Sequence, residues 1–134
     1  MYRRIMVAVD ETDTASRAVH EAIGLAHSAG AEVLFVHVGA DMPGEKALGW
    51  AAELARRAGV KGGTARVALD GGVGPTLVRE AERWTADLIV VGRHDRGALE
   101  RLVLGSVGEA VVRAAAIPVL LVRRNTLLAP TKSG

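Results

Sequence analysis

The chain of 134 residues contains no cysteine, and this absence excludes several kinds of protein at once. A disulfide scaffold, thiol catalysis, cysteine-based zinc sites and iron–sulfur clusters all require that residue. Aromatic residues are also few, so the hydrophobic core must consist mainly of valine, leucine, isoleucine and alanine; they are Tyr2, Phe35, Trp50 and Trp84. Such a core is typical of buried parallel strands covered by helices.

Long runs of one residue class are lacking as well. No apolar run approaches the roughly 20 residues of a membrane span, and the first four residues lead directly into an apolar strand rather than a secretory signal. The 17 basic and 15 acidic residues are interleaved, so the net charge of +2 includes no basic block. We therefore expect a cytoplasmic protein that binds neither membranes nor nucleic acid.

Apolar segments of two different periods alternate along the chain, which predicts a single α/β domain with a doubly wound, open parallel sheet and helices on both faces. Nearly continuous apolar runs, which are typical of central parallel strands, predict four strands at 5–9, 33–38, 88–91 and 119–122. A weaker alternation predicts an edge strand at 64–69. Helical spacing gives a first helix an apolar stripe from Ala15 to Ala26 and predicts three further helices at 45–58, 75–85 and 106–115. The domain spans 1–124, and 125–134 is expected to be a mobile tail.

The ends of three predicted helices have recognisable residues. Thr12 and Asp13 are candidate N-caps of the first helix, which should end near Gly30. Pro43 and Gly59 bracket the second helix. The glycines at 71, 72 and 74 predict a tight turn before the third helix.

Ligands of open parallel sheets bind beyond the carboxyl ends of the strands, where the strand order reverses. The loops that begin at Asp10, Gly39 and Gly92 are therefore the candidate binding loops. The stretch from Gly92 to Ser106 predicts an anion site, because glycine lets backbone N–H groups approach a phosphate and the start of a helix supplies free donors. A second interpretation needs no ligand, since Ser106 and Glu109 have the spacing of a capping box.

Several familiar motifs are missing. Asp10-Glu11-Thr12-Asp13 follows the first strand in place of the glycine-rich dinucleotide fingerprint, and no lysine follows a glycine as in a Walker A loop. Gly105-Ser106-Val107-Gly108 lacks the serine hydrolase pattern. The four histidines are scattered, so no metal site is predicted.

Carboxylates after two strands leave one further alternative, a phosphoacceptor receiver domain. Asp10, Glu11 and Asp70 would supply its acidic cluster. Such a domain would also need a lysine after the last strand, where Arg123 and Arg124 stand instead. This interpretation is therefore the weaker one.

Taken together, these segments resemble the universal stress protein family over residues 2–124. The resemblance rests on three matching parts: Ile5–Asp10, Val36-His37-Val38, and Ala86–Gly92 leading to Gly105-Ser106-Val107 and to 117–122. ATP-binding members of the family carry Gly-x2-Gly-x9-Gly-Ser/Thr. Gly92 and Gly105-Ser106 match that pattern here, but Asp95 replaces the second glycine.

The resemblance implies a stress-response protein with strand order 3-2-1-4-5, a homodimer paired through the last strands, and ATP with Mg2+ in a cleft between strands one and four. Residues implied on the adenosine side are Ala8, Val9, Asp10, Val38 and Val91. Residues implied around the phosphates are Gly92, His94, Gly105, Ser106 and Val107. At most slow ATP hydrolysis is expected, because no lysine clamp or general base can be named.

Asp95 is the departure that matters for function. A carboxylate at roughly 4 Å from a phosphate charge costs about 4 kcal/mol at an effective dielectric of 20, before relaxation and screening. Nearby arginines or a bridging Mg2+ could offset this cost. The alternative function is a dimeric protein-interaction module of the same fold that binds no nucleotide and uses the loop at 92–105 for a partner protein.

Overall fold

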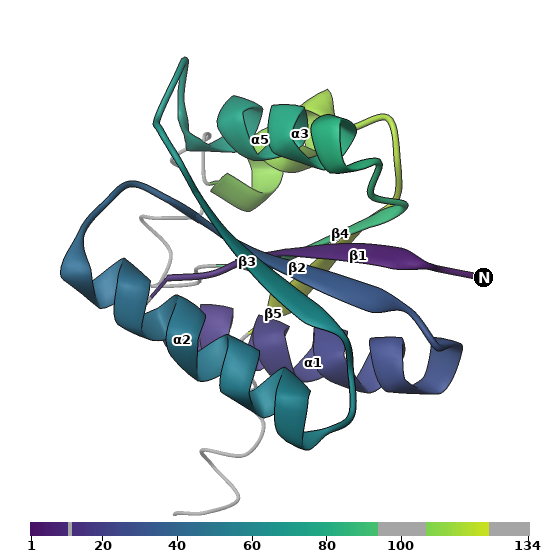
Figure 1. Ribbon diagram of the computed structural model, residues 1–134. Helices are drawn as coiled ribbons and strands as arrows, with labels where there is room; N and C mark the ends of the chain where they lie inside the picture. The colour runs from purple at the N-terminus through teal and green to yellow at the C-terminus, as the bar shows by residue number, and fades with distance from the viewer. Residues whose placement is uncertain (11, 94–106, 124–134) are drawn as a thin grey trace, which may run out of the picture.

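The computed structural model of the chain describes residues 1–10, 12–93 and 107–123, which form a three-layer α/β sandwich (Figure 1). Strands and helices alternate along the chain as β1 Arg4–Ala8, α1 Asp13–Ala29, β2 Glu32–Val38, α2 Met42–Arg57, β3 Gly62–Val67, α3 Val73–Trp84, β4 Leu88–Arg93, α5 Val107–Ala114 and β5 Val119–Arg123. The predicted tail at 125–134 lies outside the described residues.

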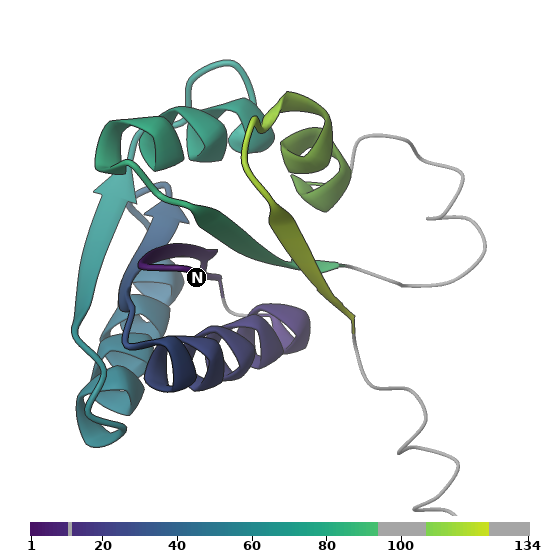
Figure 2. The same ribbon diagram turned by 90° about the vertical axis from the view of Figure 1, so that its right-hand side faces the viewer.

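The five strands form one parallel sheet in the order β3-β2-β1-β4-β5, which confirms the expected fold class and strand order. β1 lies at the centre, where Ile5 pairs with Val33 of β2 on one side and with Leu88 of β4 on the other. Figure 2 shows β3 and β5 at opposite edges of the sheet. Receiver domains have the flavodoxin-like strand order 2-1-3-4-5, which differs from the order found here. The receiver alternative is therefore wrong.

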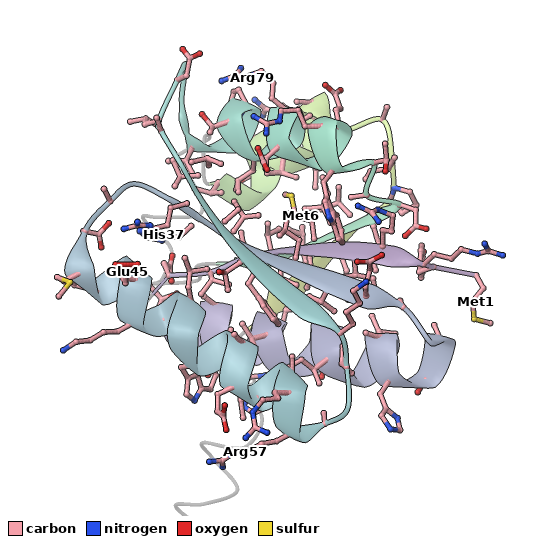
Figure 3. All side chains as sticks on the ribbon, viewed as in Figure 1. Met1, Met6, His37, Glu45, Arg57 and Arg79 are labelled. Carbon is pink, nitrogen blue, oxygen red and sulfur yellow. The ribbon has the colours of Figure 1, made fainter. Side chains whose placement is uncertain are left out.

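Each face of the sheet has its own hydrophobic core. α1 and α2 cover one face, where Ile5, Val7 and Phe35 are fully buried, and α3 and α5 cover the other face, where Met6 is fully buried (Figures 1 and 3). Successive residues of a strand point to opposite faces. A strand covered on both faces therefore needs an uninterrupted apolar run, as β1 has.

The ends of α1 follow directly from its sequence. Thr12 is the N-cap, and its Oγ1 accepts a hydrogen bond of 3.2 Å from the backbone N–H of Ala15. Gly30 ends the helix in the left-handed region at φ 69°, where its N–H donates to the Ala26 carbonyl oxygen. Both predicted boundaries are confirmed.

Three predicted elements have boundaries that are wrong by two or three residues. α2 begins at Met42 because Asp41 is its N-cap, so Pro43 lies inside the first turn rather than before the helix. α3 likewise begins at Val73, before the proline that was predicted to start it. β3 runs over 62–67 instead of 64–69, because its pairing with β2 begins at Gly62. A side chain is not tolerated easily at Gly62, since a Cβ there would lie only 3.1 Å from Ala55 Cβ of α2.

A close approach of α3 and α5 gives a first stability prediction. A Cβ on Gly74 would lie 2.5 Å from Ala110 Cβ and 3.4 Å from the backbone nitrogen of Val111. Gly74→Ala should therefore push the two helices apart and lower the free energy of unfolding by about 2 kcal/mol in urea denaturation. Gly24→Ala in α1, with no neighbour within 4 Å, is the matched control. Equal stability of both variants would contradict the close approach.

Candidate functional site

A cleft of about 190 Å³ opens beyond the carboxyl ends of β1, β2 and β4. It lies at the topological switch point, because the chain runs from β1 to β2 on one side and reaches β4 on the other. The described lining residues are Ala8, Val9, Asp10, Thr12, Ala15, Val36, His37, Val38, Val73, Leu77, Val91, Gly92 and Val107.

The cleft brings together seven of the ten predicted site residues. These are Ala8, Val9, Asp10, Val38, Val91, Gly92 and Val107. The other three, His94, Gly105 and Ser106, lie outside the described residues, as does Asp95. The binding role of all ten residues stays a prediction.

Asp10 provides an anionic group at the mouth of the cleft. Its Oδ1 accepts hydrogen bonds from the backbone N–H of Thr12 at 2.7 Å and from the Thr12 hydroxyl at 2.5 Å. These bonds fix the carboxylate at the start of α1. The second oxygen, Oδ2, is a further hydrogen-bond acceptor of this residue in the cleft lining.

The first turn of α5 packs closely on the ends of β4 and β5. A Cβ on Gly108 would lie 2.8 Å from Leu121 Cδ2 and 4.0 Å from the carbonyl oxygen of Gly92. The absence of a side chain therefore lets the helix start beside Gly92 and places Val107 in the cleft wall.

Six lining residues were not predicted for the site: Thr12, Ala15, Val36, His37, Val73 and Leu77. His37 could have been found, because it is the one ionisable residue inside the apolar run 33–38. Val73 and Leu77 could not, since only the packing of α3 over the end of the sheet brings them to the cleft.

His37 connects the end of β1 with the start of α2 (Figure 3). The buried ring places Nδ1 at 2.8 Å from the carbonyl oxygen of Val9 and Nε2 at 2.7 Å from Oδ1 of Asp41. Oδ2 of Asp41 in turn accepts from the backbone N–H of Gly44 at 2.9 Å. A carbonyl and a carboxylate can only accept hydrogen bonds. Both bonds can form at once only when both ring nitrogens carry a hydrogen, so this geometry favours the imidazolium form of His37.

The surroundings of His37 act on its pKa in opposite directions. Burial by itself lowers the pKa, but the hydrogen bonds to Asp41 and Val9 and the charges of Asp41 and Asp10 outweigh it, so the pKa of His37 lies above its usual value. The pKa of Asp41 lies below its usual value, first because of the bond from His37 and then because of the N–H of Gly44. The two groups hold each other in their charged forms.

These shifts predict how stability changes with pH. The raised pKa of His37 gives stability that is complete below the ordinary value of about 6.5 and is lost as pH rises through the folded-state pKa. The lowered pKa of Asp41 gives stability that is present above its ordinary pKa of about 3.8 and is lost as pH falls through the folded-state value. Urea midpoints measured against pH should fall on the alkaline side in the wild type. The same decline in His37→Gln would contradict the assignment to His37.

Two kinds of feature are absent from the part of the chain that the structure describes. None of its helices combines the length and the apolar character of a membrane span. No three side chains of histidine or carboxylate type gather there in a way that could hold a metal ion.

The fold and the cleft define a doubly wound α/β protein with a candidate ligand site at its switch point. The family model for the universal stress protein family matches residues 1–45 and 63–123, well over half of the chain. A universal stress protein of Methanocaldococcus jannaschii is 32% identical over 92% of this chain and 84% of its own length. The chain belongs to the universal stress protein family.

Solved structures agree with this assignment. A universal stress protein in complex with cAMP has a TM-score of 0.79 and 30% identity, and the alignment covers 90% of this chain and 96% of that one. The universal stress protein from Archaeoglobus fulgidus in complex with dAMP has a TM-score of 0.72 and 27% identity, with coverage of 90% and 98%.

Proposed function

We propose that this chain is a cytoplasmic adenine nucleotide-binding protein of the stress response, and that the nucleotide lies in the cleft between β1 and β4. The observation that carries the proposal is the gathering of seven predicted site residues around one cleft at the switch point. The solved relatives in complex with cAMP and dAMP support the choice of an adenine nucleotide.

The walls of the cleft suit the base and ribose. Ala8, Val38 and Val91 offer apolar surface to a flat ring, and Oδ2 of Asp10 can accept a hydrogen bond from a ribose hydroxyl. The volume of about 190 Å³ is below the roughly 300–1,000 Å³ of complete small-molecule sites. The described part of the cleft therefore has room for a base rather than for a whole nucleotide.

The phosphate side of the proposal rests on Gly92 and Val107 in the cleft and, by sequence alone, on His94, Gly105 and Ser106. The N–H groups at the start of α5 would face the phosphate charge. The proposed physiological ligand is ATP with Mg2+, whose charge would also offset the carboxylate of Asp95.

The test begins with protein purified without added nucleotide, denatured and examined by mass spectrometry for released nucleotide. Titration calorimetry with adenosine and with Mg-ATP then separates the two halves of the site. Asp95→Gly should bind Mg-ATP more tightly than the wild type, because a negative charge is removed near the phosphates, and should bind adenosine equally well. A wild type that binds none of these ligands would contradict the proposal.

The second candidate function is a dimeric interaction module that binds no nucleotide, and Asp95 favours it. It predicts that neither adenosine nor Mg-ATP raises the melting temperature of the wild type. It also predicts that Asp95→Gly restores Mg-ATP binding, because the fold would have kept the site that this chain lost. An ATP-dependent rise in the wild type would exclude it.

Both candidate functions include a homodimer, which we propose forms through β5. This edge strand is apolar, yet Val119, Leu120 and Leu121 are only half-buried, and Val112 of the adjoining α5 is 48% exposed. An unpaired apolar edge favours pairing with a second copy. Light scattering at micromolar concentration should give the mass of a dimer, and a monomeric mass would contradict the proposal.

A further inference from the structure

His37 holds the backbone that leads into the proposed ribose contact. The N–H of Val9 donates to the carbonyl oxygen of Val36 at 2.8 Å, and the carbonyl oxygen of Val9 accepts from Nδ1 of His37 at 2.8 Å. Both polar backbone groups of Val9 are thus bonded to β2. Asp10, the next residue, receives its position at the cleft mouth from this attachment.

The other nitrogen of His37 attaches the same ring to the start of α2. Asp41, its partner, is the N-cap of that helix, so the ring bridges two loops that both begin at the carboxyl edge of the sheet. From this geometry we infer that His37 is a positioning residue for nucleotide binding and that its imidazolium makes nucleotide affinity depend on pH. The inference rests on the proposed function of the cleft.

The ring has no room to exchange one partner for another. A Cβ on Gly44 would lie 2.0 Å from Nε2 and 2.5 Å from Cε1 of His37, so the first turn of α2 covers the ring directly. Nε2 also lies 3.6 Å from the Cβ position of Gly39 on the preceding loop. A ring held this tightly can gain or lose a proton, but it cannot turn towards other acceptors.

The charged groups around the ring come from each element packed on it. Asp41 and Asp10 act on His37 from the starts of α2 and α1. Arg66 of β3 is paired with His37 in the strand register, but its guanidinium reaches Glu45 of α2 at 3.2 Å. The surroundings therefore favour the imidazolium, in agreement with the direction of its pKa.

Loss of the proton removes one of the two bonds. A neutral ring with its hydrogen on Nδ1 keeps Val9 but turns a lone pair towards the carboxylate of Asp41. A neutral ring with its hydrogen on Nε2 keeps Asp41 but releases the carbonyl of Val9. The first change detaches the loop that follows Val38 of the cleft, and the second detaches the backbone that leads into Asp10. Affinity should therefore fall as pH rises through the pKa of His37.

Asp41→Asn separates this role from simple structural support. Asparagine is as good an N-cap as aspartate, and its oxygen can still accept from the N–H of Gly44. Its amide N–H can donate to Nε2 of a neutral His37. The hydrogen of that neutral ring is then on Nδ1, which still donates to the carbonyl oxygen of Val9. In this variant the neutral ring keeps both bonds, so deprotonation breaks neither and affinity should no longer fall at high pH.

The experiment measures the affinity for cAMP by calorimetry between about pH 6 and pH 9, since the phosphodiester of cAMP does not titrate there. Wild-type affinity should fall about tenfold towards high pH, which corresponds to the loss of one charge-assisted hydrogen bond. Asp41→Asn should keep its affinity over the same range. His37→Gln should bind weakly at every pH, and His27→Gln, an exposed histidine of α1, should follow the wild type.

Each possible failure has its own meaning. Wild-type protein that binds no cAMP at any pH overturns the proposed function and, with it, this inference. Wild-type protein that binds cAMP with the same affinity at both ends of the range overturns only the inference. A fall in cAMP affinity at high pH that persists in Asp41→Asn also overturns only the inference. NMR titration of the His37 ring, which needs no ligand, should give a pKa above the ordinary value of about 6.5, and a pKa below that value would refute the bridge itself.

Discussion

Replacing Gly44 with alanine is expected to lower the free energy of unfolding by about 3 kcal/mol, at the upper end of what overpacking costs. The new methyl group would overlap the His37 ring, with 2.0 Å to Nε2 and 2.2 Å to Cδ2. The ring fills the space under α2 and cannot move aside without leaving Val9 and Asp41. The substitution therefore breaks two hydrogen bonds of the bridge and displaces the start of the helix.

Gly49→Ala supplies the control for this prediction on the same helix. Its Cβ position has no neighbour within 4 Å, and alanine favours a helix interior over glycine, so this variant should gain up to about 1 kcal/mol. Urea denaturation of both variants at neutral pH measures the difference. If Gly44→Ala matches Gly49→Ala in stability, the ring does not occupy the position described.

Filling the cleft from its floor should abolish most nucleotide affinity. Ala8 ends β1 and lines the cleft, so leucine at this position would take up the space proposed for the base. Burial of roughly 100 Å² of ring surface contributes about 2.5 kcal/mol. Its loss corresponds to a drop in affinity of about fifty- to a hundredfold. Calorimetry with cAMP and adenosine measures the change.

The sheet itself offers the matched control for Ala8→Leu. Ala8 of β1 and Ala65 of β3 pair with opposite sides of the same residue, Val36, and both are partly buried on the face covered by α3 and α5. Ala65 does not line the cleft. Ala65→Leu should therefore leave affinity unchanged. Equal affinities of the two variants, at equal melting temperatures, would place the base elsewhere.

The periodicity of the sequence is enough to predict the layers of this fold but not the ends of all its elements. The apolar run 88–91 is typical of a central strand, because burial on both faces leaves no position for polar residues. The start of α2 depends on Asp41, whose capping role becomes visible only once its carboxylate is seen to bond Gly44 and His37. A sequence pattern alone therefore does not show which residue caps a helix when the cap also bonds a residue of another element.

The same distinction applies to the candidate site. The switch-point rule and the family resemblance lead to Asp10 and Gly92 because both residues follow directly from strands. The contribution of α3 could not be predicted, since Val73 and Leu77 look like ordinary residues of an amphipathic helix. His37 lies in the segment Val36-His37-Val38 that carries part of the family resemblance, yet its role depends on the carbonyl of Val9, which no side-chain pattern encodes.

The central position of β1 has a consequence for the order of folding. Its neighbour β2 follows after a single helix, whereas Leu88 of β4 is far along the chain. During synthesis, β1, α1, β2, α2 and β3 can assemble first, while the face around Met6 waits for α3 and α5. Until those two helices have been synthesised and have packed, one face of the sheet exposes a continuous apolar surface. We expect the newly made chain to depend on fast completion of its second half, or on a chaperone that covers this face.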